Sequence, residues 1–116
     1  MKKIFISHPL RSDFELNRKR VNYICKKLVD TKNIIPISPL HLFKFYETEP
    51  EYSDELLEMC CKIISVCDGV YFYDYGKLSE GQTIEFNHAE SLNILIEKRE
   101  PPLICKEMKY LQLRSF

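Results

Sequence analysis

Apolar and polar positions along the chain follow two periods, which predict strands alternating with helices. Four short segments rich in Ile, Val, Phe and Tyr have the length and composition of strands. They lie near residues 3–7, 33–37, 69–74 and 94–97. Between them, apolar residues recur at helical spacing (i, i+3, i+4, i+7). One such set is Val21, Ile24, Cys25 and Leu28, and a second, in a helix that begins near Ser53, is Leu56, Cys60, Ile63, Ile64 and Cys67.

This alternation predicts an α/β fold with a parallel sheet and right-handed crossover connections. The strand order is expected to be flavodoxin-like, with residues 70–73 inside the sheet. Pro36 lacks an N–H group, which favours an edge position for the second strand. Residues 98–102 are predicted to form a polar, Pro-rich link. Residues 103–116 leave a strand and a short helix equally open.

Several polar residues mark the ends of the predicted helices. Ser12 or Asp13 can cap the first helix, and Ser79 stands at the N-cap of the helix that follows the third strand. Asn93 can end that helix.

Composition limits the function classes. The 116 residues fit one domain, and 17 basic residues balance 17 acidic ones. A net charge of zero argues against a general nucleic-acid binder, which carries a basic excess. No apolar run approaches the roughly 20 residues that span a bilayer, so no membrane association is expected.

The five cysteines are interpreted as reduced, buried side chains. Their number is odd and no secretory leader precedes them, so a reducing, cytoplasmic setting is expected. Cys60, Cys61 and Cys67 are close in sequence but form no Cys-x-x-Cys pair, so no metal site is predicted. Neither a Walker motif nor Gly-x-Gly-x-x-Gly is present, and no cofactor is expected.

The candidate functional stretch runs from Cys67 to Leu92. It is predicted to form a strand, a loop and a helix N-terminus, which is the arrangement that binds ligands in α/β folds. The first N–H groups of such a helix have no intrahelical partner, and the helix dipole favours negative charge. The stretch therefore predicts a site for a phosphate-bearing, nucleotide-like ligand.

The same residues carry a family resemblance. An opening strand with a polar loop, a mid-chain Ile-Ser-Pro-Leu-His, a Cys-Asp-x-Val-Tyr strand and Ser79-Glu80-Gly81-x-x-x-Glu85 resemble the nucleoside 2-deoxyribosyltransferase superfamily. The resemblance includes its deoxynucleoside 5′-monophosphate N-hydrolase branch and phage-encoded relatives. It covers about residues 3–97, within a single domain of residues 1–116 whose residues 98–116 form a C-terminal extension. It implies a flavodoxin-like (Rossmann-like) three-layer sandwich with a four- to five-stranded parallel sheet, assembled into oligomers.

The resemblance also implies roles for Glu85 and Ser79. Glu85 would be the nucleophile that attacks the anomeric carbon of a nucleoside or nucleotide, stabilising an oxocarbenium-like state. Ser79 would lie close to a phosphate, and Gly81 would let the ligand approach the backbone. The residues themselves add further ligand-binding candidates, which are Ser7, His8, Arg11, Asp74, Tyr75 and His88. His8 and Arg11 fit solvated loop positions equally well. His88 is three residues after Glu85 and could orient that carboxylate, although a histidine at this spacing more often packs.

One departure from the resemblance divides the function into two alternatives. The enzymes carry an Asp eight residues before the position of Asp68, and this chain has Cys60 there. The first alternative is cleavage or transfer at the N-glycosidic bond. The second is a phage-type sponge that sequesters a nucleotide immune signal without turnover.

The segment from Leu40 to Tyr46 is more apolar than a solvated loop. Large exposed apolar patches usually mark contacts between molecules. The segment is therefore a candidate to fold over the ligand or to contact another subunit, and the sequence predicts a homodimer or a higher oligomer. A satellite hydrophobic cluster explains the segment equally well.

Overall fold

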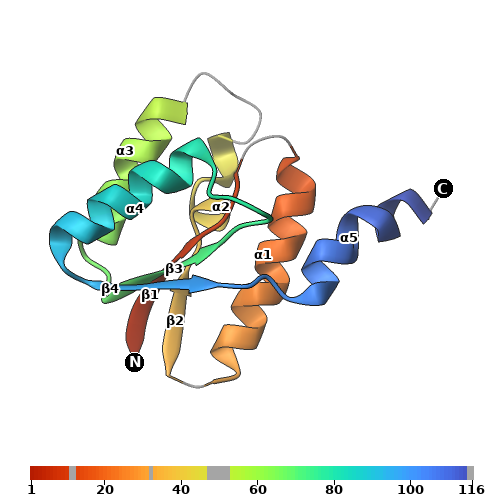
Figure 1. The fold of residues 1–116 in the computed structure, drawn as a ribbon, viewed down its shortest axis with the longest axis horizontal. Coiled ribbons are helices and arrows are strands. Elements are labelled where there is room, and N and C mark those ends of the chain that lie inside the picture. The colour runs from red at the N-terminus through yellow and green to blue at the C-terminus, as the bar shows by residue number, and fades with distance from the viewer. Residues whose placement is uncertain (11–12, 32, 47–52, 115–116) are drawn as a thin grey trace.

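In the part of the chain that the structure describes, the sheet is parallel and has four strands. The computed structural model describes residues 1–10, 13–31, 33–46 and 53–114. Its strands are β1 (Lys2–Ser7), β2 (Ile34–Ile37), β3 (Gly69–Tyr73) and β4 (Leu95–Arg99). They are ordered β2-β1-β3-β4, and all neighbours run parallel (Figure 1). The predicted flavodoxin-like order is confirmed, with β3 inside the sheet and the Pro36 strand at an edge.

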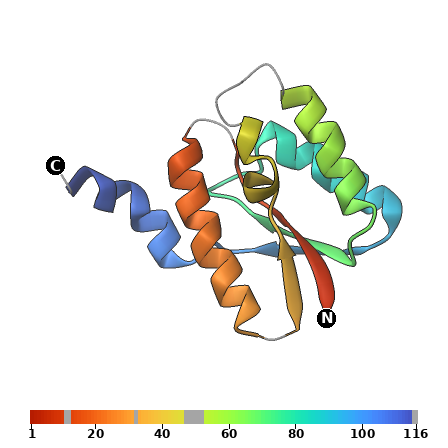
Figure 2. The same ribbon diagram turned by 180° about the vertical axis from the view of Figure 1, so that it is seen from behind.

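Helices cover both faces of the sheet. They are α1 (Phe14–Val29), α2 (Pro39–Leu42), the 3₁₀ turn η1 (Lys44–Tyr46), α3 (Ser53–Ile64), α4 (Glu80–Leu92) and α5 (Leu103–Arg114). α1 and α5 pack on one face, and α3 and α4 pack together on the other (Figures 1 and 2). The protein is thus a three-layer α/β sandwich. In the described part of the chain, no helix has the length and apolar character needed to cross a membrane.

Alternating side chains of the central strands supply a separate core to each face. In β3, Val70 and Phe72 point to the side of α3 and α4, while Tyr71 and Tyr73 point to the side of α1. This is the period of two expected of a strand. All five residues of β3 are buried, as both faces of a parallel sheet must be when helices cover them.

The predicted helix ends are largely confirmed. The Asp13 side chain accepts a hydrogen bond from the Leu16 N–H and caps α1; Ser12, the other candidate cap, lies outside the described residues. Asn93 ends α4 in the left-handed conformation, with φ of 59°. A polar side chain that tolerates this conformation explains why the helix stops there.

Two expectations about chain segments were wrong, and one open alternative is decided. Lys98 and Arg99 belong to β4 and not to the link. The Lys98 ammonium lies over the Phe86 ring and the Arg99 guanidinium over the Tyr71 ring, and these cation–π contacts stabilise charged residues in an edge strand. α3 ends at Ile64, so Cys67 is buried from the turn that follows and not from the helix. Residues 103–114 are helical.

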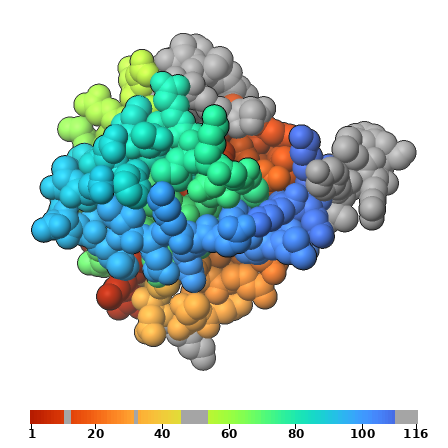
Figure 3. Space-filling view, viewed as in Figure 1, coloured from red at the N-terminus to blue at the C-terminus, as the bar shows by residue number. Residues whose placement is uncertain are grey.

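The two outer strands differ in what covers them. β2 lies beside α1 and α2, whereas β4 lies at the surface between α4 and the start of α5 (Figure 3). The central pair, β1 and β3, is enclosed. At the carboxyl ends of these two strands, the carbonyl groups of Ser7 and Tyr73 are bonded to a side chain of α4.

Candidate functional site

The candidate site is built where β1 and β3 end side by side. From β1 the chain crosses to β2 through α1 on one face, and from β3 it crosses to β4 through α4 on the other. The two crossovers leave in opposite directions, so this point is the topological switch of the sheet. Open α/β sheets bind ligands outside the carboxyl ends of their strands at this place. Ser7 is the last residue of β1, and Tyr73 is the last residue of β3.

Gln82 joins the two strand ends to α4. Its side-chain amide donates to the carbonyl oxygens of Ser7 (3.2 Å) and Tyr73 (2.7 Å). Its Oε1 accepts the Ser79 N–H, and the Ser79 hydroxyl accepts the Gln82 N–H, which together form a capping box. The side chain is 1% exposed and has all of these partners. One residue thus starts α4 and fixes it over the switch point.

Glu85 lies one turn further along α4 and points into the same region. It is 3% exposed, and its Oε1 accepts a hydrogen bond of 2.7 Å from the Ser7 hydroxyl. Burial raises the pKa of this carboxyl to about 7, although hydrogen bonds from Ser7 and from the Cys60 thiol oppose the shift. A carboxyl group poised near neutrality can hold or release a proton at physiological pH.

Cys60 occupies the position where the resemblance places an acid. It is fully buried on α3, and its thiol donates to Glu85. Burial raises the pKa of Cys60 strongly, and the neighbouring charge of Glu85 acts in the same direction. A thiol with a raised pKa is a poor proton donor to a leaving group and a poor nucleophile. Glu85 is therefore the one buried carboxyl group in the described part of this site.

On the other side of Ser7, His8 and Tyr75 form a second polar pair. His8 Nδ1 donates to the Pro9 carbonyl (2.9 Å), so Nε2 is the acceptor and the Tyr75 hydroxyl donates to it (2.7 Å). Burial lowers the pKa of His8 to about 4, and the positive charge of Arg20 also lowers it. The imidazole is consequently neutral at physiological pH. The Arg20 guanidinium lies over the Tyr75 ring, 4.1 Å from its centroid.

The other candidates have different local roles. Asp74 accepts the Gly76 N–H and shapes the turn after β3. His88 shares a hydrogen bond of 2.9 Å with the Ser65 hydroxyl, so its observed partner is at the end of α3 and not Glu85. A side chain at Gly81 would meet Leu57 of α3 at 3.2 Å, so this glycine allows the close approach of α3 and α4. Arg11 lies outside the described residues.

Two residues of the site were missed in the sequence. The signal for Gln82 was present, because Ser-x-x-Gln before a helix is a capping-box pattern. Its bonds to two strand ends had no local signal. Arg20 had none either, since it belongs to a run of basic residues on α1 and its partners, Tyr75 and Cys105, are distant in sequence.

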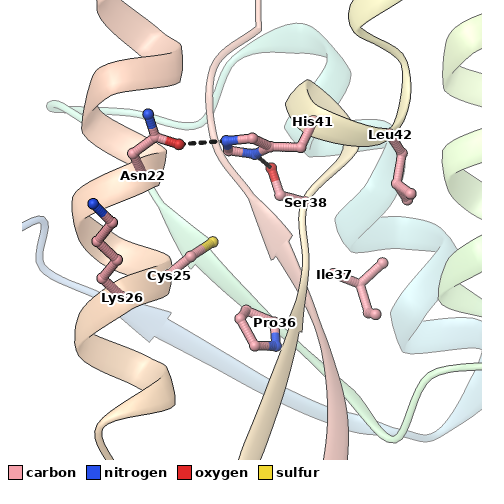
Figure 4. A pocket seen from close by; sticks show the side chains of 8 residues that line it. All are labelled: Asn22, Cys25, Lys26, Pro36, Ile37, Ser38, His41 and Leu42. Carbon is pink, nitrogen blue, oxygen red and sulfur yellow. Dashed lines mark hydrogen bonds between the residues drawn. The ribbon is translucent and has the colours of Figure 1, made fainter.

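A separate hollow of about 310 Å³ lies between α1 and the β2–α2 corner (Figure 4). His41 crosses it: its Nε2 donates to the Asn22 side-chain oxygen (2.5 Å), and its Nδ1 accepts from the Ser38 hydroxyl (2.8 Å). Burial lowers the pKa of His41, as do the charges of Arg18 and Lys44. The bond to Asn22 joins α2 to α1, while the bond to Ser38 stays within the start of α2. Within the described ranges, no three His, Cys, Asp or Glu side chains come together as metal ligands would.

Comparison with known proteins identifies a family for this chain. Residues 2–99 match the family described as Domain of unknown function (DUF7768). The chain belongs to the DUF7768 family. Neither the curated proteins nor the solved structures compared with it gave a significant match. The DUF7768 match ends at Arg99, the last residue of β4, so it includes the whole sheet and α4 but not α5.

Proposed function

We propose that this protein binds a nucleoside or nucleotide at the carboxyl ends of β1 and β3. The observation that carries the proposal is the buried carboxyl of Glu85, held by Ser7 at the topological switch point. Burying an ionisable group costs stability, and such groups concentrate at functional sites. A carboxylate here has the chemistry to accept hydrogen bonds from ribose hydroxyls. His8 and Tyr75 lie on the other side of Ser7 and offer aromatic and polar contacts for a base or sugar.

The start of α4 supports an anionic group on the ligand. The N–H of Gln82 is taken by the Ser79 hydroxyl. Among the described residues, no acceptor is bonded to the N–H groups of Glu80 and Gly81, the first two of the helix. Unpaired N–H groups at a helix N-terminus bind phosphate through both hydrogen bonding and the helix dipole.

Two outcomes for the bound ligand follow from Glu85 and Cys60. If the N-glycosidic bond is cleaved, Glu85 is the nucleophile at the anomeric carbon. The contact between Glu85 and the Cys60 thiol favours the alternative, which is sequestration without turnover. The reason is that protonating the departing base needs a second acid, and a thiol of raised pKa does not provide one.

Binding and turnover can be separated with Glu85→Gln. The wild type is incubated with a panel of nucleosides and nucleotides, free base is measured by chromatography, and affinity is measured by calorimetry. An enzyme would lose turnover by roughly a thousandfold or more in Glu85→Gln and keep its affinity. A sequestering protein would release no base in either form. In that case the binding free energy of Glu85→Gln would be weaker by about 1 kcal/mol, because one hydrogen bond to the ligand is lost.

The matched control is Glu90→Gln, which removes an exposed carboxylate from the same helix. We expect it to bind and react as the wild type does. If neither Glu85→Gln nor Glu90→Gln changes affinity, and the wild type releases no base, the site lies elsewhere.

We also propose that the protein self-associates through the segment around α2 and η1. Leu42 and Phe45 are exposed there, Phe45 by 68%, while Phe43 packs into the core beneath α3 and α4. Exposed apolar side chains next to each other favour a contact between copies.

We expect light scattering at tens of micromolar to give at least a dimer, and Phe45→Ser to shift the population toward monomer. Val66→Ser, an equally exposed position elsewhere, should not; a monomeric wild type contradicts the proposal.

A further inference from the structure

The C-terminal helix α5 lies outside the DUF7768 match, yet it is bonded to the helix that borders the site. It begins after Pro101 and Pro102, with its start beside α1 and its last turns directed away from α1 and the sheet (Figures 1 and 2). Cys105, on the first turn of α5, is fully buried against α1. Its thiol donates to the Arg20 carbonyl (3.5 Å), and its own carbonyl accepts from Arg20 Nε (2.8 Å). The two residues therefore hold each other.

Arg20 passes this contact on to the candidate site. The bond from Nε to the Cys105 carbonyl holds the guanidinium in place, and its Cζ atom lies 4.1 Å from the centroid of the Tyr75 ring. The Tyr75 hydroxyl in turn donates to His8 Nε2. An unbroken series of contacts thus runs from α5 through Arg20 and Tyr75 to His8, the residue after β1.

We propose that Arg20 is a positioning residue for the site and that α5 is the element that holds Arg20 in place. An arginine side chain that lost its Nε partner would regain several rotamers, because long side chains lose much freedom on ordering. The ring it covers would then move, and the hydrogen bond from Tyr75 to His8 would weaken. The geometry of His8 and Tyr75 thus depends on a helix outside the matched domain. The consequence for ligand binding rests on the proposed function; the positioning itself does not.

Arginine suits this place better than lysine would. Its guanidinium is planar, so it can stack on an aromatic ring and donate from Nε at the same time. A lysine ammonium at the same position keeps the charge and provides neither a plane nor an Nε donor. Arg20→Lys and Arg20→Leu therefore separate the effect of charge from the effect of position.

The tautomer of His8 is the readout that a merely structural role would not move. In the wild type, Nδ1 carries the proton because it donates to Pro9, and Tyr75 holds Nε2 as an acceptor. Imidazole nitrogen NMR at neutral pH should report this tautomer alone. In Arg20→Leu, the ratio of the Nδ1-protonated to the Nε2-protonated tautomer should fall by about tenfold, which corresponds to the loss of one hydrogen bond. In Arg20→Lys, the same ratio should fall nearly as far.

Two further variants complete the test. Lys19→Leu changes the exposed neighbour of Arg20, which is paired with Glu15, and should leave the His8 tautomer as in the wild type. Cys105→Lys places a second positive charge beside Arg20 and should release α5, reproducing the Arg20→Leu spectrum. Circular dichroism and thermal unfolding establish that each variant is folded. A wild-type tautomer ratio in both Arg20 variants overturns the proposal.

The ligand arm uses adenosine and deoxyadenosine 5′-monophosphate as calorimetric probes. We expect Arg20→Leu to weaken binding of the probe that the wild type binds by about tenfold, and Lys19→Leu to leave it unchanged. A wild type that binds neither probe, together with an altered His8 tautomer in Arg20→Leu, counts against the proposed function and leaves the positioning role standing. Normal binding with an unaltered tautomer counts against the positioning role alone.

Discussion

Glu85→Gln should make the protein more stable than the wild type at neutral and alkaline pH, by about 3 kcal/mol once Glu85 is ionised. The folded state raises the pKa of this carboxyl from 4.5 to about 7, so the folded protein binds a proton that the unfolded chain has released. A raised carboxyl pKa contributes stability that is fully present below pH 4.5 and is lost as pH rises through about 7. Glutamine keeps the shape of the protonated acid and has no charge to bury.

The measurement is the free energy of unfolding by denaturant across this pH range. The difference between Glu85→Gln and the wild type should be small below pH 4.5, grow between pH 4.5 and 7, and then level off. Taking the difference removes the contribution of every other titrating group. Glu90→Gln, on the exposed side of the same helix, should run parallel to the wild type. Parallel curves for Glu85→Gln as well would mean that Glu85 is not held as the geometry indicates.

Gln82→Met should lower the free energy of unfolding by about 3 kcal/mol. Methionine has similar length but cannot donate, so the buried carbonyl oxygens of Ser7 and Tyr73 would each lose a partner. The N–H of Ser79 would lose its acceptor as well. Leaving a buried polar group unsatisfied costs about 1–3 kcal/mol, more than the net gain from making the bond.

Denaturant unfolding at constant pH measures this loss. The matched control is Asn87→Met, which removes an exposed amide from the same helix and should change stability by less than about 0.5 kcal/mol. Equal stabilities for the two variants would contradict the role of Gln82 in joining the strand ends.

The strands and helices could be predicted because each is marked by local signals. Both central strands contain a continuous apolar run, and the helices that follow them carry clear capping residues such as Asp13, Ser79 and Asn93. β4 was the least well predicted strand. Its charged residues satisfy no strand pattern by themselves, and only the rings of Phe86 and Tyr71 beneath Lys98 and Arg99 explain the last two positions.

The positions of the candidate site residues along the fold were predictable, but the contacts between them were not. The sequence alone locates Ser79 and Glu85 at the start of a helix after the third strand. It does not reveal that Glu85 meets Ser7 and Cys60, since those contacts join residues far apart in the chain. The pKa of Glu85 follows from that burial, so it too was out of reach. Likewise, the bond from Arg20 to Cys105 became visible only when α5 was placed on α1.

The two outer strands of the sheet also limit how copies of this protein can join. A long, flat strand edge pairs readily with another strand and promotes aggregation. β2 offers four residues, one of which is Pro36, and β4 presents the charged residues Glu97, Lys98 and Arg99. Neither edge is a good template for strand addition. A dimer should therefore keep two separate four-stranded sheets joined through helices and loops, and not one continuous eight-stranded sheet.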